Sequence, residues 1–412
     1  MSVKWIDGGV TAPQGFRAAG IHVGVKTHNP DKRDLALIAS DAECGAAAVF
    51  TKNIVKAAPV LVTREHLANG KLRAVIANSG NANACAPNGE TNARNMCEAA
   101  AAALGISADD VAVASTGVIG QELPAEKITS AVPELARALS YDGSADAAAA
   151  IMTTDTVKKE FALEVQIGGK TVKIGGIAKG SGMIHPNMGT MLAFVTTDCA
   201  VSGGMLSALV KSAAGESFNR ISVDGDTSTN DTCIVLANGL ACNAEITEPG
   251  ADCELLGDAL RALCVRLATA MAADGEGATH LVTCTVSNAE TEDKAETIAK
   301  SVISSSLVKA AFFGADANWG RILCAMGYSG ADFDPERVDV AFRSAAGAVA
   351  VCASGRGLPF DEARAKTILT EHDVEVLIDL HEQTAPGECG ECTCWGCDMT
   401  YDYVKINGDY RT

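Results

Sequence analysis

The sequence predicts an α+β protein, because stretches with strand-like alternation occur between longer stretches with helical character. Apolar residues alternate from Phe161 to Ile167, two glycines follow, and the alternation resumes at Val172, which is the pattern of a β-hairpin. Residues 87–105, by contrast, form an alanine-rich segment that is opened by a proline and ended by a glycine, as helices commonly are.

Length and composition bound the remaining possibilities. The chain has 412 residues, which is enough for two or three domains with a large core. Hydrophobic residues make up 48% but aromatic residues only 4%, so the core must consist mainly of Ala, Val, Leu and Ile. The 33 Lys and Arg against 51 Asp and Glu give a net charge of −18, a poor match for nucleic acid or an anionic membrane. No apolar run approaches the roughly 18 residues of a membrane helix, and the start lacks the apolar core of a signal peptide, so we expect a cytoplasmic protein.

The other expected elements follow the same two patterns. We expect strands at 72–77, 111–115, 190–195, 234–236 and 280–288, and helices at 147–152, 205–218, 252–273 and 292–312. Strands at 338–342 and 374–380 indicate a smaller α+β unit near the end of the chain. We therefore expect a main domain at 1–280 and a smaller domain at 281–412, with a tail that docks as a strand through Tyr403, Val404 and Ile406.

Gly189-Thr190 lies where a segment of small residues, starting at Lys179, meets an apolar run. Glycine permits the backbone angles that a self-cleaving peptide bond needs. Attack of the Thr190 hydroxyl on the preceding carbonyl would free an α-amino group with a pKa of about 7.7–8, suited to act as the base for that hydroxyl. A threonine that opens a buried strand is otherwise ordinary, so this prediction depends on the neighbouring motifs.

Two loops that follow predicted strands are candidate ligand-binding corners. Residues 78–84 are all small and polar and precede the helix opened by Pro87, whose first backbone amides are unpaired. Thr116 and Gly117 follow the next strand, where a hydroxyl and an amide would both point at a developing oxyanion. Lys179, beside small residues, is suited to pair with a substrate carboxylate. Each motif alone is more often an ordinary turn or a surface lysine.

Taken together, these motifs resemble the ornithine acetyltransferase family, the bifunctional glutamate N-acetyltransferases of arginine biosynthesis. The resemblance covers nearly the whole chain and includes 116–120 (Thr-Gly-Val-Ile-Gly), 224–231 (Asp-Gly-Asp-Thr-Ser-Thr-Asn-Asp), 313–321 and the tail 398–412, in the expected order. Family members usually carry Ala-Thr at the cleavage point, where this chain has Gly189-Thr190.

The resemblance implies a layered α/β/β/α sandwich of the N-terminal-nucleophile-like type, cleaved into chains 1–189 and 190–412 that assemble as two α and two β chains. It implies that Thr190 takes the acetyl group of N2-acetyl-L-ornithine and passes it to L-glutamate, while Thr116 and Gly117 form the oxyanion hole. The substrate contacts that it implies come from Thr153, Lys179, Thr190, Glu276, Asn407 and Thr412. It implies no metal and no cofactor, and it leaves open whether acetyl-CoA is also a donor.

Two alternatives stay open at this point. A self-cleaving aminopeptidase or amidase would use the same threonine with water as the acceptor. A cysteine-rich metal-binding protein is the other, because Cys389, Cys392, Cys394 and Cys397 form C-x₂-C-x-C-x₂-C in what we expect to be an acidic loop. The two pairs nearly overlap, unlike the separated pairs of usual zinc sites, which favours a redox-sensitive or plain loop.

Overall fold

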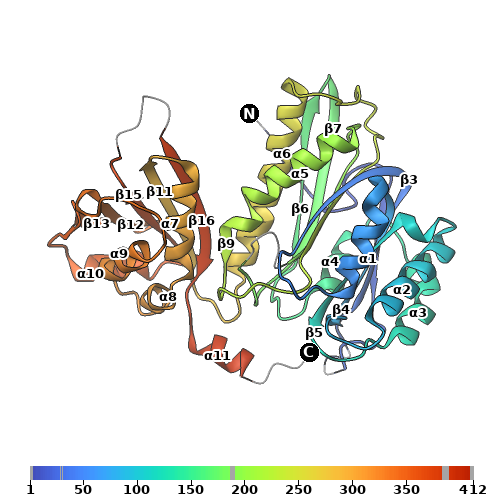
Figure 1. The fold of residues 1–412 in the computed structure, drawn as a ribbon, viewed down its shortest axis with the longest axis horizontal. Helices are drawn as coiled ribbons and strands as arrows, with labels where there is room; N and C mark the ends of the chain where they lie inside the picture. Colours follow the sequence, from blue (N-terminus) through green and yellow to red (C-terminus); the bar gives the residue numbers. More distant parts are fainter. Residues whose placement is uncertain (1–2, 28, 30, 186–190, 383–388, 409–412) are drawn as a thin grey trace. The chain divides into compact units, whose positions relative to one another are not determined.

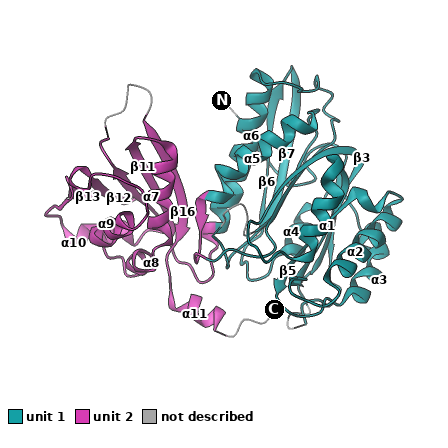
Figure 2. Cartoon of the chain, in the orientation of Figure 1, with its two compact units in different colours: residues 1–219, 226–271, 411–412 teal, residues 220–225, 272–410 magenta. Residues whose placement is uncertain are grey.

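The computed structural model describes residues 3–27, 29, 31–185, 191–382 and 389–408. The described residues divide into a larger unit, 1–219 and 226–271, and a smaller unit, 220–225 and 272–410 (Figure 2). The contacts divide the chain after Met271 and give 220–225 to the smaller unit. The domain boundary expected at residue 280 stays a prediction.

The described part of the larger unit contains one nine-stranded sheet in the order β1-β6-β7-β8-β10-β3-β4-β5, with β2 paired to β3. Its strands are β1 (Lys4–Ile6), β2 (Phe16–Ile21), β3 (Leu35–Phe50), β4 (Lys71–Asn81), β5 (Val111–Val118), β6 (Lys159–Ile167), β7 (Lys170–Lys179), β8 (Leu192–Thr197) and β10 (Thr232–Ala237). Its helices are α1 (Ala58–His66), α2 (Gly89–Leu104), α3 (Ala125–Arg137), α4 (Ser144–Ile151), α5 (Gly203–Gly215) and α6 (Ala251–Ala273), the last of which ends in the smaller unit.

The larger unit is layered because the two faces of its central strands pack against different partners. On β3, Leu37 and Ala39 belong to a core shared with helices α1, α2 and α3, whereas Ala36 and Ile38 belong to a core shared with α4. Helix α4 contacts β2, β3 and β4 as well as β6 and β7, so it packs against strands from both parts of the sheet (Figure 1). This alternation of buried faces is the two-residue period of β-strands, and it confirms the predicted layered α+β architecture.

The described part of the smaller unit has a seven-stranded sheet in the order β14-β13-β12-β15-β11-β16-β9. Its strands are β9 (Ile221–Ser222), β11 (Leu281–Ala289), β12 (Asp339–Ser344), β13 (Gly347–Ala353), β14 (Arg356–Gly357), β15 (Asp373–Asp379) and β16 (Gly390–Cys397). Its helices are α7 (Glu292–Ser304), α8 (Ser306–Phe313), α9 (Trp319–Gly327), α10 (Glu362–Leu369) and α11 (Tyr401–Asn407). Helices α7 to α10 and one face of the sheet share a single core.

Several local predictions are confirmed. The hairpin of β6 and β7 turns at Gly168 and Gly169, both with positive φ, and α2 ends at a left-handed Gly105. The long helix predicted at 252–273 is α6. In the described ranges, no helix is both long and apolar enough to cross a membrane.

Other local predictions are wrong, for identifiable reasons. The tail is helix α11 rather than a strand, because Thr400 caps it by accepting a hydrogen bond from the Tyr403 amide. The single helix expected at 292–312 is split at Ser305, whose side chain caps α8. The cysteine-rich segment forms strand β16 rather than a loop.

Candidate active site

The end of β5 presents Thr116 and Gly117 beside the end of β4. The two strands are parallel, and Gly80 of β4 lies opposite Gly117. A Cβ on Gly117 would lie 2.3 Å from the Gly80 carbonyl carbon, and φ at Gly117 is +134°. Only glycine fits this position, so the Gly117 backbone is held at a fixed place at the strand end. Thr116 beside it is half-buried.

Asparagine side chains tie the small-residue loop of 78–84 to this strand end. Asn78 accepts a hydrogen bond of 2.6 Å from the Ser115 hydroxyl. Asn230, from the aspartate-rich motif, donates to the carbonyls of Ala82 at 2.6 Å and Ser115 at 2.8 Å. Three sequence motifs that are far apart in the chain therefore meet beside Thr116, where the buried side chains of Asn78 and Asn230 join them.

The start of β8 lies next to this network. Thr232, which follows the aspartate-rich motif, is the register partner of Leu192 and donates its amide to the Met191 carbonyl at 2.9 Å. Lys179, at the end of β7, is the register partner of the same Leu192 from the other side. Gly189 and Thr190 lie outside the described residues, and the cleavage predicted between them stays a prediction. Met191, which directly follows Thr190 in the sequence, lies at this point of the larger unit.

Lys179 and Thr153 are brought together by a residue that our sequence analysis did not single out, Asp155. The Asp155 side chain is fully buried and accepts hydrogen bonds from the Thr153 amide at 3.0 Å and the Gly180 amide at 2.7 Å. The Lys159 ammonium lies 2.7 Å from Oδ1 of Asp155, and that of Lys179 lies 3.9 Å from Oδ2. Burial alone would raise the pKa of Asp155, but the Lys179 and Lys159 charges hold it well below its usual value.

Two further buried charges surround this cluster. Burial lowers the pKa of Lys26 to about 8. The aliphatic part of its side chain lies against Gly80, and the charges of Lys179 and Asp155 also act on its ammonium group. Asp231 precedes β10, and burial raises its pKa well above the usual value despite the charge of Lys179. Within the described residues, Oδ2 of Asp231 has no hydrogen-bond partner. The site is thus rich in ammonium groups, which suits it to bind a carboxylate.

In the smaller unit, two predicted substrate-binding residues contact each other directly. The Asn407 side-chain amide of α11 donates a 2.6 Å hydrogen bond to the buried carboxylate of Glu276. Glu276 lies in the loop between α6 and β11, and the Thr400 hydroxyl donates to the Gly277 carbonyl of that loop at 2.7 Å. A Cβ on Gly277 would lie 2.8 Å from the Asp402 Cβ, so glycine permits the close approach of α11.

A buried aspartate, Asp398, holds the same loop through hydrogen bonds. It accepts hydrogen bonds from the amides of Thr279 at 2.8 Å and His280 at 3.1 Å, and from the Thr279 hydroxyl at 2.5 Å. The His280 ring nitrogen Nδ1 lies 3.0 Å from its Oδ2. Burial alone would raise the pKa of Asp398, but the hydrogen bonds from His280 and Thr279 lower it. Thr412 lies outside the described residues, so its predicted substrate contact stays a prediction.

The cysteine-rich segment has a structural explanation as β16. Cys394 is the register partner of Cys284 on β11, and both, with Cys392, are buried in the core of the smaller unit. Burial raises the pKa of the Cys284 and Cys394 thiols, which makes them unreactive. In the part of the chain that the structure describes, no group of three His, Cys, Asp or Glu residues has the geometry to hold a metal ion.

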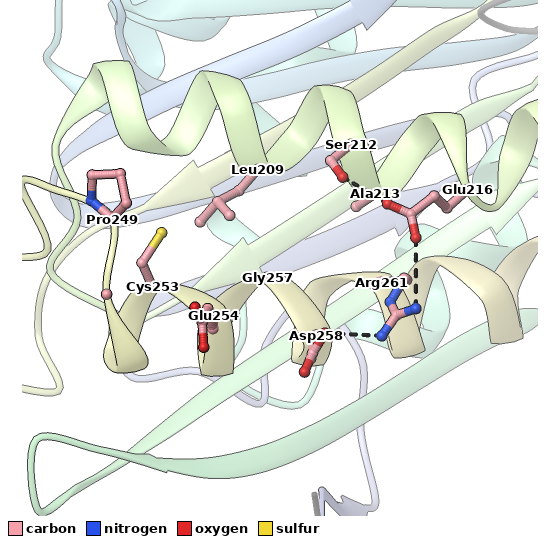
Figure 3. A pocket seen from close by; sticks show the side chains of 11 residues that line it. Leu209, Ser212, Ala213, Glu216, Pro249, Cys253, Glu254, Gly257, Asp258 and Arg261 are labelled. Carbon is pink, nitrogen blue, oxygen red and sulfur yellow. Dashed lines mark hydrogen bonds and ion pairs between the residues drawn. The ribbon is translucent and has the colours of Figure 1, made fainter. Parts of the chain in front are cut away.

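A surface pocket of about 500 Å³ lies between α5 and α6 of the larger unit (Figure 3). Arg261 bridges Glu216 and Asp258 at its edge, with closest distances of 3.5 and 2.9 Å. None of the predicted site residues that the structure describes lines this pocket. The chemistry-bearing residues are therefore at the strand ends and in the Glu276 loop, and this outer pocket is a separate feature.

Comparison with known proteins shows which proteins this chain resembles. The ArgJ family matches residues 17–412 of the chain. The arginine biosynthesis bifunctional protein ArgJ of Symbiobacterium thermophilum is 53% identical over 411 residues, which is 100% of both chains. The protein of the same name from Caldanaerobacter subterraneus is 48% identical over 410 residues, 99% of each chain. A crystal structure of ArgJ from Bacillus halodurans is 43% identical with a TM-score of 0.50, and covers 54% of this chain and 100% of that one.

Proposed function

We propose, from the premise that the chain belongs to the ArgJ family of arginine biosynthesis, that it moves an acetyl group from N2-acetyl-L-ornithine to L-glutamate through an acetyl-threonine at Thr190. The relatives match this chain along their whole length, and both are named arginine biosynthesis bifunctional proteins. This supports acetyl transfer over the aminopeptidase or amidase alternative. The substrates are small molecules, so the site needs to recognise an amino-acid carboxylate and a reacting acetyl group.

One observation carries the proposal. Asn230 joins the end of β5, which holds Thr116 and Gly117, to the start of β10. Strand β10 pairs with β8, which begins two residues after Thr190. The oxyanion hole proposed at Thr116 and Gly117 is therefore tied, by hydrogen bonds within one sheet, to the chain segment that follows the nucleophile. This connection supports a common site for attack and charge stabilisation.

The proposed reaction has two balanced halves. The Thr190 hydroxyl oxygen attacks the acetyl carbonyl of N-acetylornithine while its proton passes to the freed Thr190 α-amine. The Thr116 hydroxyl and the Gly117 amide donate to the oxyanion until the C–N bond breaks, and ornithine leaves with the proton. The glutamate amine then attacks the acetyl-threonine ester, Thr190 is released as the alcohol, and N-acetylglutamate departs.

The described substrate-binding residues are proposed to act in both halves of the reaction. The Lys179 ammonium is suited to pair with the α-carboxylate that both amino acids carry. The Glu276 carboxylate, oriented by Asn407, is suited to the side-chain ammonium group of N-acetylornithine and to the attacking amine of glutamate. Thr153 contributes from the loop that Asp155 fixes. Thr412 is proposed to add a contact from the end of the tail.

The proposed cleavage before Thr190 has support from the Bacillus halodurans structure. That solved chain is matched along its full length by 54% of this chain. Residues 190–412 are 223 of the 412 residues, the same share. We propose that chains 1–189 and 190–412 remain associated as two α and two β chains, and that the enzyme is cytoplasmic. Acetyl-threonine chemistry needs no cofactor, and acetyl-CoA is proposed as a second donor, which an assay for released coenzyme A would test.

Replacing the nucleophile tests the function. We expect Thr190→Ala to remain one uncut chain and to lose acetyl transfer by about 10⁴-fold or more, because both the hydroxyl and its amine disappear. The measurement is formation of N-acetylglutamate from N-acetylornithine and glutamate, with intact mass determined on the same samples. A Thr190→Ala protein that transfers acetyl groups as fast as the wild type would contradict the proposal.

A further inference from the structure

Asp155 connects two segments that are predicted to bind substrate and are otherwise separated by the whole β6–β7 hairpin. One of its oxygens, Oδ2, accepts from the Thr153 amide at 3.0 Å, and the other, Oδ1, accepts from the Gly180 amide at 2.7 Å. Gly180 directly follows Lys179. A single carboxylate thus sets the spacing between the Thr153 loop and the backbone that carries the Lys179 side chain.

The two lysines that face Asp155 are not equivalent. The Lys159 ammonium makes the closer ion pair, 2.7 Å from Oδ1, whereas that of Lys179 is 3.9 Å from Oδ2. The Asp155 and Lys159 side chains are 0% and 1% exposed, so this pair is out of water, and the Lys179 side chain is 8% exposed. Lys159 therefore forms the shorter ion pair with Asp155, and the Lys179 charge also acts on the carboxylate from a longer distance.

Other charged groups lie around this cluster. Lys26, Lys159 and Lys179 contribute ammonium groups, and Asp155 contributes a carboxylate. Asp34 contributes a second carboxylate, which accepts hydrogen bonds from the backbone amides of residues 23 to 26 and whose charge opposes the lowering of the Lys26 pKa by burial. Asp231 is also buried, and burial raises its pKa well above the usual value. The ammonium groups therefore lie beside buried carboxylates that stabilise their charged form.

We propose that Asp155 is the positioning residue that makes Thr153 and Lys179 one carboxylate-binding element, with Lys159 as its closer counter-ion. This inference depends on the proposed function, because the carboxylate is that of N-acetylornithine and, in the second half of the cycle, of glutamate. Asp155 does not touch the reacting atoms. It acts through the placement and the protonation of Lys179.

Removal of the Asp155 charge has two expected consequences. The substrate carboxylate meets a lysine that is no longer held in place, so substrate binding weakens more than the chemical step. The buried ammonium groups beside Asp155 also lose an anion that stabilises their charged form. The alkaline fall of kcat/KM therefore moves to lower pH, a change that a purely structural residue would not produce.

The experiment compares the cleaved wild-type enzyme with Asp155→Asn, which keeps the size and one acceptor oxygen of the side chain. We expect the KM for N-acetylornithine and for glutamate to rise about tenfold or more, with a smaller fall in kcat, since hydrogen bonds to charged groups have this strength. We also expect the alkaline limb of the kcat/KM profile to shift to lower pH. Asp142→Asn, an exposed aspartate of the same unit, is the matched control and is expected to match the wild type.

The outcomes separate this inference from the proposed function. A wild-type enzyme without acetyl transfer would defeat the function, whereas an active wild type with an Asp155→Asn variant of unchanged KM and pH profile would overturn the role of Asp155. If Asp155→Asn does not fold, Lys159→Gln decides instead. Without the closer counter-ion, Lys179 pairs with Asp155, so the KM for both substrates rises; an unchanged KM in Lys159→Gln overturns the inference.

Discussion

Asp155 and Asp398 are buried aspartates that organise predicted substrate-binding residues in the two units by different physical means. Asp155 faces two lysine ammonium groups and two backbone amides. Asp398 is held by the amides of Thr279 and His280, the Thr279 hydroxyl and the His280 ring. In the larger unit the carboxylate is stabilised mainly by opposite charge, and in the smaller unit mainly by hydrogen bonds.

The difference determines what each carboxylate controls. A carboxylate paired to lysines controls the charge of those lysines, so Asp155 affects both the place and the protonation of Lys179. A carboxylate held by loop amides fixes the loop itself, so Asp398 determines the shape of the segment that carries Glu276. The larger unit therefore contains buried ammonium groups around Asp155, and the smaller unit contains the buried Glu276 carboxylate.

The largest effect is expected where a glycine is sterically required. Gly117→Ala places a Cβ 2.3 Å from the Gly80 carbonyl carbon and displaces the oxyanion-hole amide, so we expect acetyl transfer to fall about hundredfold or more. Gly277→Ala in the smaller unit meets the Asp402 Cβ at 2.8 Å and moves α11, which we expect to cost less in kcat and more in KM. Steady-state kinetics measures both, and Gly204→Ala, with no atom near its Cβ, is the control.

The kinetic difference between the two glycine variants is what makes them informative. Equal losses confined to kcat in both variants would contradict the division into an oxyanion site in one unit and a binding loop in the other.

An intermediate effect is expected from Asp398→Asn. The change removes the carboxylate from its four hydrogen-bond partners, so we expect a loss of about 2 kcal/mol in the free energy of unfolding. The pKa of Asp398 is lowered in the fold, so its stabilisation is present above the usual aspartate pKa and is lost as pH falls through the lowered value. Denaturant unfolding at pH 7 and at pH 3 checks this: the gap between variant and wild type should narrow at acid pH. A gap that stays constant with pH would show that Asp398 does not act through its charge.

The smallest effect is expected at the exposed end of α11. Asn407→Ala removes the hydrogen bond to Glu276 and leaves that carboxylate less well oriented, so we expect the KM to rise about fivefold with little change in stability. Lys405→Ala, an exposed neighbour on the same helix, is the matched control. Glu276→Gln with Asn407→Ala forms a double-mutant cycle, and purely additive effects would contradict the coupling of the two residues.

Much of the fold was predictable because local patterns agreed with the tertiary packing. The hairpin around Gly168 and Gly169 and the glycine-ended α2 depend on neighbouring residues alone, and both were predicted. The tail was predicted as a strand from Tyr403, Val404 and Ile406, but the capping hydroxyl of Thr400 and contacts with the Gly277 loop decide for a helix. Strand β16 was missed because its cysteines pack as small apolar residues, which the spacing of their sulfurs does not reveal.

The site was predictable only in part, and the missing part is the same in both units. Thr116, Gly117, Thr153, Lys179, Glu276 and Asn407 were predicted from motifs, and their roles in substrate binding and catalysis stay predictions. Asp155, Asp398 and Lys26 were not singled out, because aspartates and lysines are usually exposed and only the fold shows these to be buried. The signal that was present is a charged residue within a run of small ones, as at Asp155 after Thr153 and Thr154.

The most direct test is the intact mass of the purified protein before and after incubation with N-acetylornithine in the absence of glutamate. The account predicts two chains, 1–189 and 190–412, and a second chain that becomes heavier by one acetyl group on Thr190 and loses that group when glutamate is added. A single uncut chain that still transfers acetyl groups at full rate, or a cleaved protein that never carries the acetyl group, would contradict it.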